Sequence, residues 1–248
     1  MPKPNQIELA TGETIPILYE DRSVLAIDKP PGWMLVPFTW QKTNRNLHAA
    51  LTSSIAAGDF WARSRNLKFL RHVHRLDAET SGILLLAKSP GALDALSELF
   101  ESRQVEKVYL AVVVGVPKES AWTCRLKIGP DPKQIGRQMV DSRSGKEAET
   151  NFRVLQSAGG KSLIEARPVT GRTHQIRVHL AAAGHPVVGD EWYGEARKAE
   201  RLPASRRREA AVALRAVSLA YSDPFTARGV RIQASAQDFL NRWLPSPA

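Results

Sequence analysis

The residues with the clearest chemical potential lie in one segment, His74-Arg75-Leu76-Asp77-Ala78-Glu79-Thr80-Ser81-Gly82. It places the carboxylate of Asp77 two residues from the cation of Arg75, directly before the apolar run 83–87. A positioned carboxylate beside a cation can act as a nucleophile or as a general acid or base. Position alone fits a turn residue or a surface ion pair equally well. The crowding of ionisable groups in this segment, and a second polar motif at 170–180, favour a reaction centre.

The second motif opens on a glycine and runs into an expected helix over 174–183. Gly171 permits unusual backbone angles, and Arg172 lies at the helix entrance. Thr173 is the expected N-cap, and Gly184 is the expected stop. Helical spacing divides the side chains between two neighbouring faces, one with His174, Arg177 and Val178 and the other with Gln175 and His179.

Arg177 is flanked by the apolar residues Ile176 and Val178. An arginine in that setting is often half-buried and then needs an anionic partner, for which Asp77 is the natural candidate. The alternative is a surface arginine whose aliphatic stem covers the core. The sequence leaves both interpretations open.

The sequence argues against a metal site and a nucleotide cofactor. No pair of histidines has the i,i+4 spacing with an accompanying glutamate, and Cys124 is the only cysteine. No glycine-rich phosphate loop is present. The histidines that invite a metal interpretation are His72, His74, His174, His179 and His185.

The composition points to a polyanionic partner. Thirty-five lysines and arginines against 25 aspartates and glutamates give a formal charge of +10, for which nucleic acid is the commonest partner. The alternative is a general solubility bias of the proteome. A basic segment at 195–209 is either a mobile loop that touches phosphate or a solvated surface. A single cysteine, and the lack of a leader or of a long apolar run, indicate a cytoplasmic protein with no membrane association.

Hydrophobic spacing predicts the elements that must position these motifs. Strands are expected at 15–19, 24–28, 82–88, 107–116, 150–156, 161–169, 214–221 and 228–235. Helices are expected at 47–57, 90–103, 174–183 and 237–244. Since these elements do not alternate as a regular βαβ series, we predict an α+β fold with a mixed, mostly antiparallel central sheet and flanking helices. Residues 1–14 are expected to form a flexible arm, and residues 15–248 a single domain.

Five segments, in order along the chain, resemble the RluA-type pseudouridine synthases. Segment 74–82 looks like the signature of that family, and segment 170–180 like its second motif. The other matches are Tyr19-Glu20-Asp21 through Lys29-Pro30-Pro31-Gly32, Lys107-Val108-Tyr109-Leu110-Ala111, and Gly184 through Asp190 with Tyr193-Gly194. The resemblance runs from about residue 15 to the C-terminus.

The resemblance implies a pseudouridine synthase fold with a basic active-site cleft. It implies an isomerase that converts uridine in RNA into its C5-glycoside without cofactor or metal. Asp77 would be the catalytic carboxylate, and Arg75 would fill the space left by the flipped base. Tyr109 would pack on that base, and Arg177 would pair with Asp77. Further RNA contacts are expected from His74, Thr80, Arg172, His174 and Gln175.

The chain departs from the family pattern at two places. Arg215 stands where a histidine is usual, and Val36-Pro37 stands where His-Pro is usual. Both departures concern local RNA contacts and leave the catalytic set intact. The chain also resembles the form of the family that lacks an N-terminal S4 RNA-binding domain, for which a monomer is the default. The RNA target is left open between tRNA, large-subunit rRNA and both.

Two alternative functions are weighed against the isomerase. One is a catalytically silent RNA-binding or assembly factor on the same fold, against which the presence of Asp77, Tyr109 and Arg177 argues. The other is a base-flipping glycosylase that uses Asp77. A hydrolytic glycosidase ordinarily needs two carboxylates and a water. Release of free uracil, as opposed to formation of pseudouridine, distinguishes the three.

Overall fold

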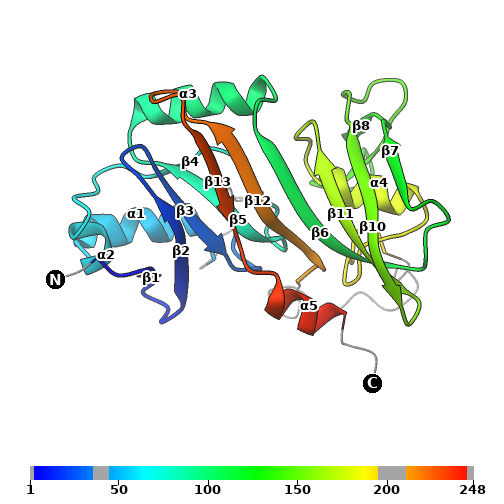
Figure 1. The fold of residues 1–248 in the computed structure, drawn as a ribbon, viewed down its shortest axis with the longest axis horizontal. Coiled ribbons are helices and arrows are strands. Elements are labelled where there is room, and N and C mark those ends of the chain that lie inside the picture. Colours follow the sequence, from blue (N-terminus) through cyan, green and yellow to red (C-terminus); the bar gives the residue numbers. More distant parts are fainter. Residues whose placement is uncertain (1–2, 36–44, 195–210, 245–248) are drawn as a thin grey trace. The chain divides into compact units, whose positions relative to one another are not determined.

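A computed structural model describes residues 3–35, 45–194 and 211–244. The fold is drawn in Figure 1, and the chain divides into two compact units by its internal contacts. The single domain over residues 15–248 stays a prediction. The first unit comprises Met1–Val105 and Ser218–Ala234, and the second comprises Glu106–Val217 and Ser235–Ala248. Val36 and the basic segment 195–209, for which we had expectations, lie outside the described residues.

The first unit is built on antiparallel strands. In order across the sheet these are β1 (Gln6–Glu8), β2 (Thr14–Glu20), β3 (Val24–Lys29) and β5 (Ser81–Ala87). The short strand β4 (Arg71–His72) pairs with β5, and β12 (Leu214–Ser222), whose last residues belong to this unit, pairs with β13 (Gly229–Gln233). Its helices are α1 (Leu47–Ala57), α2 (Phe60–Arg63) and α3 (Pro90–Glu101).

Strand β5 is the buried strand that the sequence predicts directly after the first motif. Residues 82–87 are all buried, and β5 pairs with β3 from Val24 opposite Ala87 to Lys29 opposite Gly82. Helix α3 packs against β5 and begins with Ser89, whose hydroxyl accepts from the backbone of Ala92 as an N-cap. The motif therefore precedes a strand that is fixed by its neighbours.

The expected N-terminal arm is partly ordered in the structure. Residues of β1 pair with β2, with Ile7 opposite Ile15. Ile7 and Leu9 are buried to 0% and 5% exposure, because their alternating apolar side chains turn to the same side of the strand. The polar composition of residues 1–14 concealed these two contacts.

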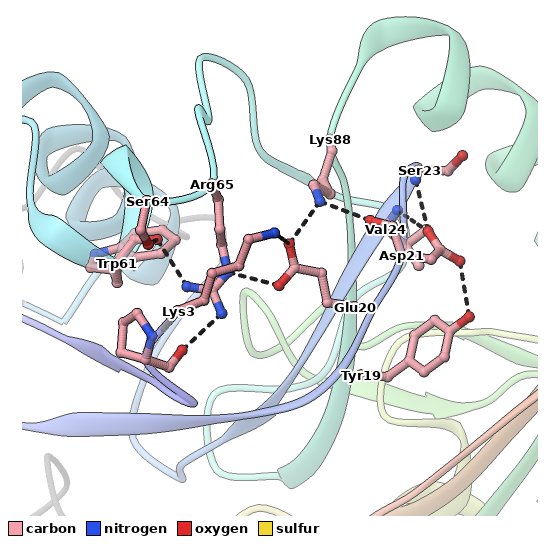
Figure 2. A network of polar contacts seen from close by, with 11 residues as sticks. Lys3, Tyr19, Glu20, Asp21, Ser23, Val24, Trp61, Ser64, Arg65 and Lys88 are labelled. Atoms are coloured by element: carbon pink, nitrogen blue, oxygen red, sulfur yellow. Dashed lines mark hydrogen bonds and ion pairs between the residues drawn. The ribbon is translucent and has the colours of Figure 1, made fainter. Parts of the chain in front are cut away.

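One polar network ties the far end of β3 and β5 to the rest of the first unit (Figure 2). The carboxylate of Glu20 accepts from Lys88 Nζ at 2.9 Å and from Arg65 Nε at 2.8 Å. Asp21 caps the turn before β3 by accepting from the backbone of Ser23 and Val24. Burial acts to raise the pKa of Glu20, but the hydrogen bonds from Lys88 and Arg65 outweigh it and lower the pKa.

The second unit is also built on antiparallel strands. Its strands run in the order β6 (Glu106–Val114), β11 (Lys161–Pro168), β10 (Thr150–Ala158) and β7 (Ala121–Cys124). A small pair, β8 (Ile128–Pro130) and β9 (Gln138–Val140), lies apart from them, and the helices are α4 (Gln175–Ala182) and α5 (Gln237–Trp243). The predicted hairpin is confirmed, with Gly159 and Gly160 both at positive φ between paired Ala158 and Lys161. The predicted α+β class is also confirmed.

Helix α4 begins one residue later than predicted, and Thr173 is not its N-cap. His174 takes the N-cap position in a left-handed conformation with φ 55° and forms no side-chain cap. The reason is a set of hydrogen bonds from Gln175 that turns the chain before the helix, as described below. Ile176 and Leu180 then pack into a core with Ala111 and Ile164.

The burial of Ile7 provides a test of the ordered N-terminus. Replacing Ile7 with Ala is expected to lower the free energy of unfolding by about 2 kcal/mol or more, because it leaves a cavity in the core. Glu8→Ala, at the exposed neighbouring position, is the matched control and should change it by less than about 0.5 kcal/mol. Urea titrations of both variants measure the difference, and equal values would mean that residues 6–9 do not pack as described.

Candidate active site

Asp77 lies in the turn between β4 and β5 at the rim of the buried strand. The Thr80 N–H donates to the Asp77 carbonyl at 3.2 Å, and Val73 N–H donates to Leu85 O at 2.9 Å. Asp77 is half-buried, and Arg75 in the same turn is exposed. The backbone of residues 73–80, which we call the catalytic turn, is thereby fixed at both of its ends.

A buried lysine holds this turn from the end of β3. Lys29 is 0% exposed, and its ammonium donates to the carbonyl oxygens of Pro30, Ala78 and Thr80 at 3.1, 3.0 and 2.8 Å. Three acceptors satisfy the three donors of an ammonium group. Gly32 N–H adds a second contact to Ala78 O at 2.8 Å. The Lys-Pro-Pro-Gly turn therefore binds the backbone of the catalytic turn.

Burial also changes the acidity of this lysine. Desolvation lowers the pKa of Lys29 to about 7, while the nearby carboxylates of Glu79 and Asp77 act to raise it. The ammonium that holds the catalytic turn is therefore close to losing a proton near neutral pH. The sequence missed this role, although a lysine that ends the apolar strand Val24–Lys29 was a visible signal.

The other two residues expected to contact RNA from the first motif face inward. His74 Nε2 accepts from Leu85 N–H at 3.1 Å, and its ring stacks on Phe100 with the ring centroids 4.7 Å apart. Thr80 is 2% exposed, and its hydroxyl has no hydrogen-bond partner among the described residues. Both positions favour a role in holding the catalytic turn over the RNA contact that we expected. Arg75 is the exposed cation of this motif.

In the second unit, Arg177 forms a buried, two-pronged ion pair. Its Nε and Nη2 atoms donate to Asp190 Oδ2 and Oδ1 at 2.7 and 2.9 Å, and the two side chains are 1% and 0% exposed. The predicted need for an anionic partner is confirmed, and Asp190 meets it. Asp77 belongs to the other unit, and its pairing with Arg177 stays a prediction.

Asp190 and Arg177 together organise the loop that carries Tyr193. Asp190 Oδ1 also accepts from the backbone of Trp192 and Tyr193 at 3.0 and 3.2 Å. The guanidinium groups of Arg137 and Arg177 lie over the Tyr193 ring, with their Cζ atoms 5.2 and 5.3 Å from the ring centroid. Such cation–π contacts are strengthened by burial.

His174 is buried beneath this tyrosine. Its Nδ1 lies 2.8 Å from the Tyr193 hydroxyl, which also accepts from Gln138 N–H at 2.9 Å. His174 is 6% exposed and has a positive φ, an uncommon conformation for a residue other than glycine. The surroundings favour a positioning role over the RNA contact that we expected.

Both the oxygen and the nitrogen of the Gln175 side-chain amide form hydrogen bonds within the protein. Its Oε1 accepts from the Thr170 hydroxyl at 2.6 Å and from Arg172 N–H at 2.9 Å. Its Nε2 donates to Glu149 O and to the Thr150 hydroxyl, each at 2.9 Å. His179 reaches the same hydroxyl with Nδ1 at 3.0 Å, which confirms that the two side chains share a face of α4. Gln175 thus shapes the loop before the helix.

The remaining expected residues of the second unit lie nearer the surface. Arg172 is half-buried and donates from Nε to Glu147 O at 2.9 Å. Tyr109 on β6 lies opposite Ala166 of β11 and packs on the core of this unit while half-buried. Arg215, at the position that departs from the family pattern, donates from Nε to Ser235 O at 2.9 Å. Their roles toward RNA stay predictions.

Comparison with known proteins identifies the family of the chain. The sequence profile of a family described as RNA pseudouridylate synthase matches residues 23–182, which include the catalytic turn and the second motif. The chain belongs to this family. It is therefore an isomerase of the RNA pseudouridine synthase class.

Individual members of the family align along most of the chain. A ribosomal large subunit pseudouridine synthase C of Salmonella typhimurium is 35% identical over 229 residues, covering 92% of this chain and 68% of that protein. The solved structure of human RNA Pseudouridylate Synthase Domain Containing 4 has a TM-score of 0.69 and 26% identity, with 92% of each chain covered. Human RNA Pseudouridylate Synthase Domain Containing 1 has a TM-score of 0.68 and 27% identity, covering 89% of this chain and 83% of that chain.

Two features of the described residues of this pseudouridine synthase concern metals and membranes. Within the described residues, no three side chains of His, Cys, Asp or Glu gather where they could hold a metal ion. No helix in that part of the chain is long and apolar enough to cross a membrane. The expected lack of a cofactor stays a prediction.

The acidity of Lys29 predicts an alkaline loss of activity. Turnover of the pseudouridine synthase should fall as the pH rises through about 7, because the neutral amine holds the catalytic turn less tightly. Lys29→Met should have low turnover at every pH and lose this step from its profile. Lys29→Arg, which keeps the charge, should lose the step near pH 7 as well, since a guanidinium does not deprotonate there.

The free energy of unfolding should rise with pH while turnover falls. A loss of turnover can therefore be distinguished from unfolding. The folded pKa of Lys29 is lowered below its ordinary value of 10.5, so the unfolded chain binds the extra proton between about pH 7 and 10.5. The contribution of Lys29 to the free energy of unfolding therefore rises with pH in this window. Turnover that falls only together with stability would contradict the assignment.

The buried ion pair predicts a large stability effect in the second unit. Asp190→Asn leaves the guanidinium of Arg177 without its counter-charge and should lower the free energy of unfolding by about 3 kcal/mol. Glu191→Gln, at the exposed next position, removes the same charge and should change it by less than about 0.5 kcal/mol. Chemical denaturation measures both, and a small effect of Asp190→Asn would show that the pair does not organise this loop.

Proposed function

We propose that this pseudouridine synthase uses Asp77 to isomerise uridines of large-subunit rRNA. The observation that carries the proposal is the catalytic turn, in which a backbone fixed by Lys29 presents a half-buried carboxylate beside an exposed arginine. The large-subunit target is taken from the name of the Salmonella typhimurium relative, which covers most of the chain. A target in tRNA remains the second possibility for the same chemistry.

The chemistry follows from one positioned carboxylate. Asp77 attacks the ribose C1′ or assists cleavage of the bond between C1′ and N1 of the uracil. The uracil then rotates in place and a bond forms between C1′ and C5, which displaces the Asp77 carboxylate from C1′ if it had bonded there. The C5 proton is lost while N1 gains a proton. Atoms and electrons balance without an oxidant, a reductant or a water molecule, so a cofactor is not required.

The target nucleotide must leave its stack before Asp77 can reach the sugar. Arg75 is exposed on the catalytic turn, and in this proposal its side chain occupies the vacated space. Tyr109 packs on the flipped uracil, and Arg177 supports the carboxylate. Because Asp77 belongs to one unit and Tyr109 and Arg177 to the other, their joint action is part of the proposal. The protein acts as a cytoplasmic monomer.

The decisive experiment removes the carboxylate. Asp77→Asn keeps the shape of the side chain and should lower the rate of pseudouridine formation in a large-subunit rRNA transcript by about 10²–10⁴-fold or more. Binding of the transcript should change by less than about threefold, since neutral Asn adds no repulsion toward phosphate. Asp94→Asn, at an exposed position of α3 in the same unit, is the matched control and should retain turnover.

The products separate this proposal from its alternatives. Full activity in Asp77→Asn would exclude Asp77 as the catalytic carboxylate. Binding of the transcript by the wild-type protein with neither pseudouridine nor free uracil would indicate a silent RNA-binding factor. Free uracil would indicate a glycosylase. Turnover on a tRNA transcript but not on rRNA would correct the target and leave the chemistry in place.

A further inference from the structure

Four basic side chains gather at the catalytic turn in the first unit. His48 lies on α1, Arg71 and His72 form β4, and Arg75 lies on the turn itself. The rings of His48 and His72 meet edge to face, with their centroids 6.0 Å apart. Strand β4 pairs with the far end of β5, with Arg71 opposite Ala87 and His72 opposite Leu86, so the cluster has a defined place on the strand that leads into the catalytic turn.

The two arginines of this cluster lack a counter-charge within the described residues. Neither Arg71 nor Arg75 makes a side-chain hydrogen bond or ion pair there, and both are exposed. Arg65 in the same unit shows the contrasting case, since its side chain is 3% exposed and paired with Glu20. The cluster therefore concentrates positive charge that the described part of the protein does not neutralise.

Burial, and then the nearby positive charges, lower the pKa values of the two histidines. Burial lowers the pKa of His48, and the charge of Arg71 lowers it further. Burial also lowers the pKa of His72, followed by the charges of His48, Arg71 and Arg75. The charged groups that act on the pair come from α1, β4 and the catalytic turn, and all are cations. An anion bound here would raise the pKa of both histidines and draw in protons.

We propose that His48, Arg71 and His72 form a binding site for a phosphate group of the RNA backbone, at a distance from the nucleotide that Asp77 and Arg75 engage. The inference rests on the proposed function, because it takes the polyanion to be the RNA substrate. Arginine binds phosphate through paired N–H donors, and a protonated histidine adds a charge-assisted hydrogen bond. Phosphate contacts set the register of a protein on nucleic acid, so this site positions the target uridine.

A metal ion fits the cluster less well. Two histidines alone do not complete a metal coordination shell, and the described residues supply no third ligand of the His, Cys, Asp or Glu type. The neighbouring arginines repel a cation. An anion is therefore the ligand that the charges favour.

The first test uses the salt dependence of binding. For a large-subunit rRNA transcript, the slope of log K against log salt should decrease in magnitude by roughly 0.7–0.9 in Arg71→Gln, as expected for one lost phosphate contact. Lys68→Gln, an exposed lysine in the segment before β4, removes the same charge outside the cluster and should leave the slope unchanged. Equal slopes for Arg71→Gln and the wild type would overturn the site.

The second test uses the pH dependence of RNA binding. Wild-type binding should tighten as the pH falls from about 7.5 to 5.5, by up to about tenfold per pH unit for each proton taken up. His48→Asn and His72→Asn should each weaken this dependence, and the double variant should lose it. The single variants guard against misfolding, and each should unfold at the wild-type urea concentration. An unchanged pH dependence in the double variant would overturn the proposal.

Inorganic phosphate distinguishes a site for RNA from a site for free phosphate. Calorimetric titration with inorganic phosphate should show only weak, millimolar binding, and micromolar binding would overturn the assignment to RNA. The proposed function fails separately, if the wild-type protein forms no pseudouridine in rRNA or tRNA transcripts. Pseudouridine formation with unaltered salt and pH dependence in the variants would leave that function standing and exclude the phosphate site.

Discussion

The interaction on which the catalytic turn depends is the contact between a buried ammonium and three carbonyl oxygens. Lys29 bonds to its neighbour Pro30 and, across the chain, to Ala78 and Thr80, which flank Glu79 just after Asp77. These bonds fix the backbone from which the Asp77 side chain extends. Burying a charge is costly unless its donors are satisfied, and here all three are. The resulting shift of its pKa toward neutrality ties the shape of the turn to the protonation of one amine.

In the second unit, an ion pair fixes the backbone of a loop. Arg177 and Asp190 are both buried, and a pair of this kind contributes less to stability than its charges suggest, because both groups lose their hydration. Its value lies in geometry: Asp190 also binds the backbone of Trp192 and Tyr193, and Arg177 lies over the Tyr193 ring. A two-pronged pair between planar groups allows little rotation, so it defines where that loop lies.

Sequence patterns predicted the features that arise from local spacing. The apolar run of β5, the hairpin around Gly159 and Gly160, and helix α3 follow directly from hydrophobic periodicity and turn residues. The need of Arg177 for an anion was also visible, because its neighbours are apolar. Its partner Asp190 was not, since nothing local brings residues from α4 and the following loop together. The start of α4 was missed because a buried amide, Gln175, overrides the capping preference of Thr173.

The positive charges in the described part of the chain include buried cations with partners and exposed cations without a carboxylate partner. The buried or nearly buried cations Lys29, Arg65 and Arg177 bond to carbonyl groups or carboxylates, so they contribute little to the field outside the protein. Arg71 and Arg75 are exposed, on β4 and on the catalytic turn that follows it, and have no carboxylate partner among the described residues. A net charge of +10 spread evenly would attract RNA without orienting it. In the proposed phosphate site, the exposed arginine both attracts a phosphate and sets the register of the RNA.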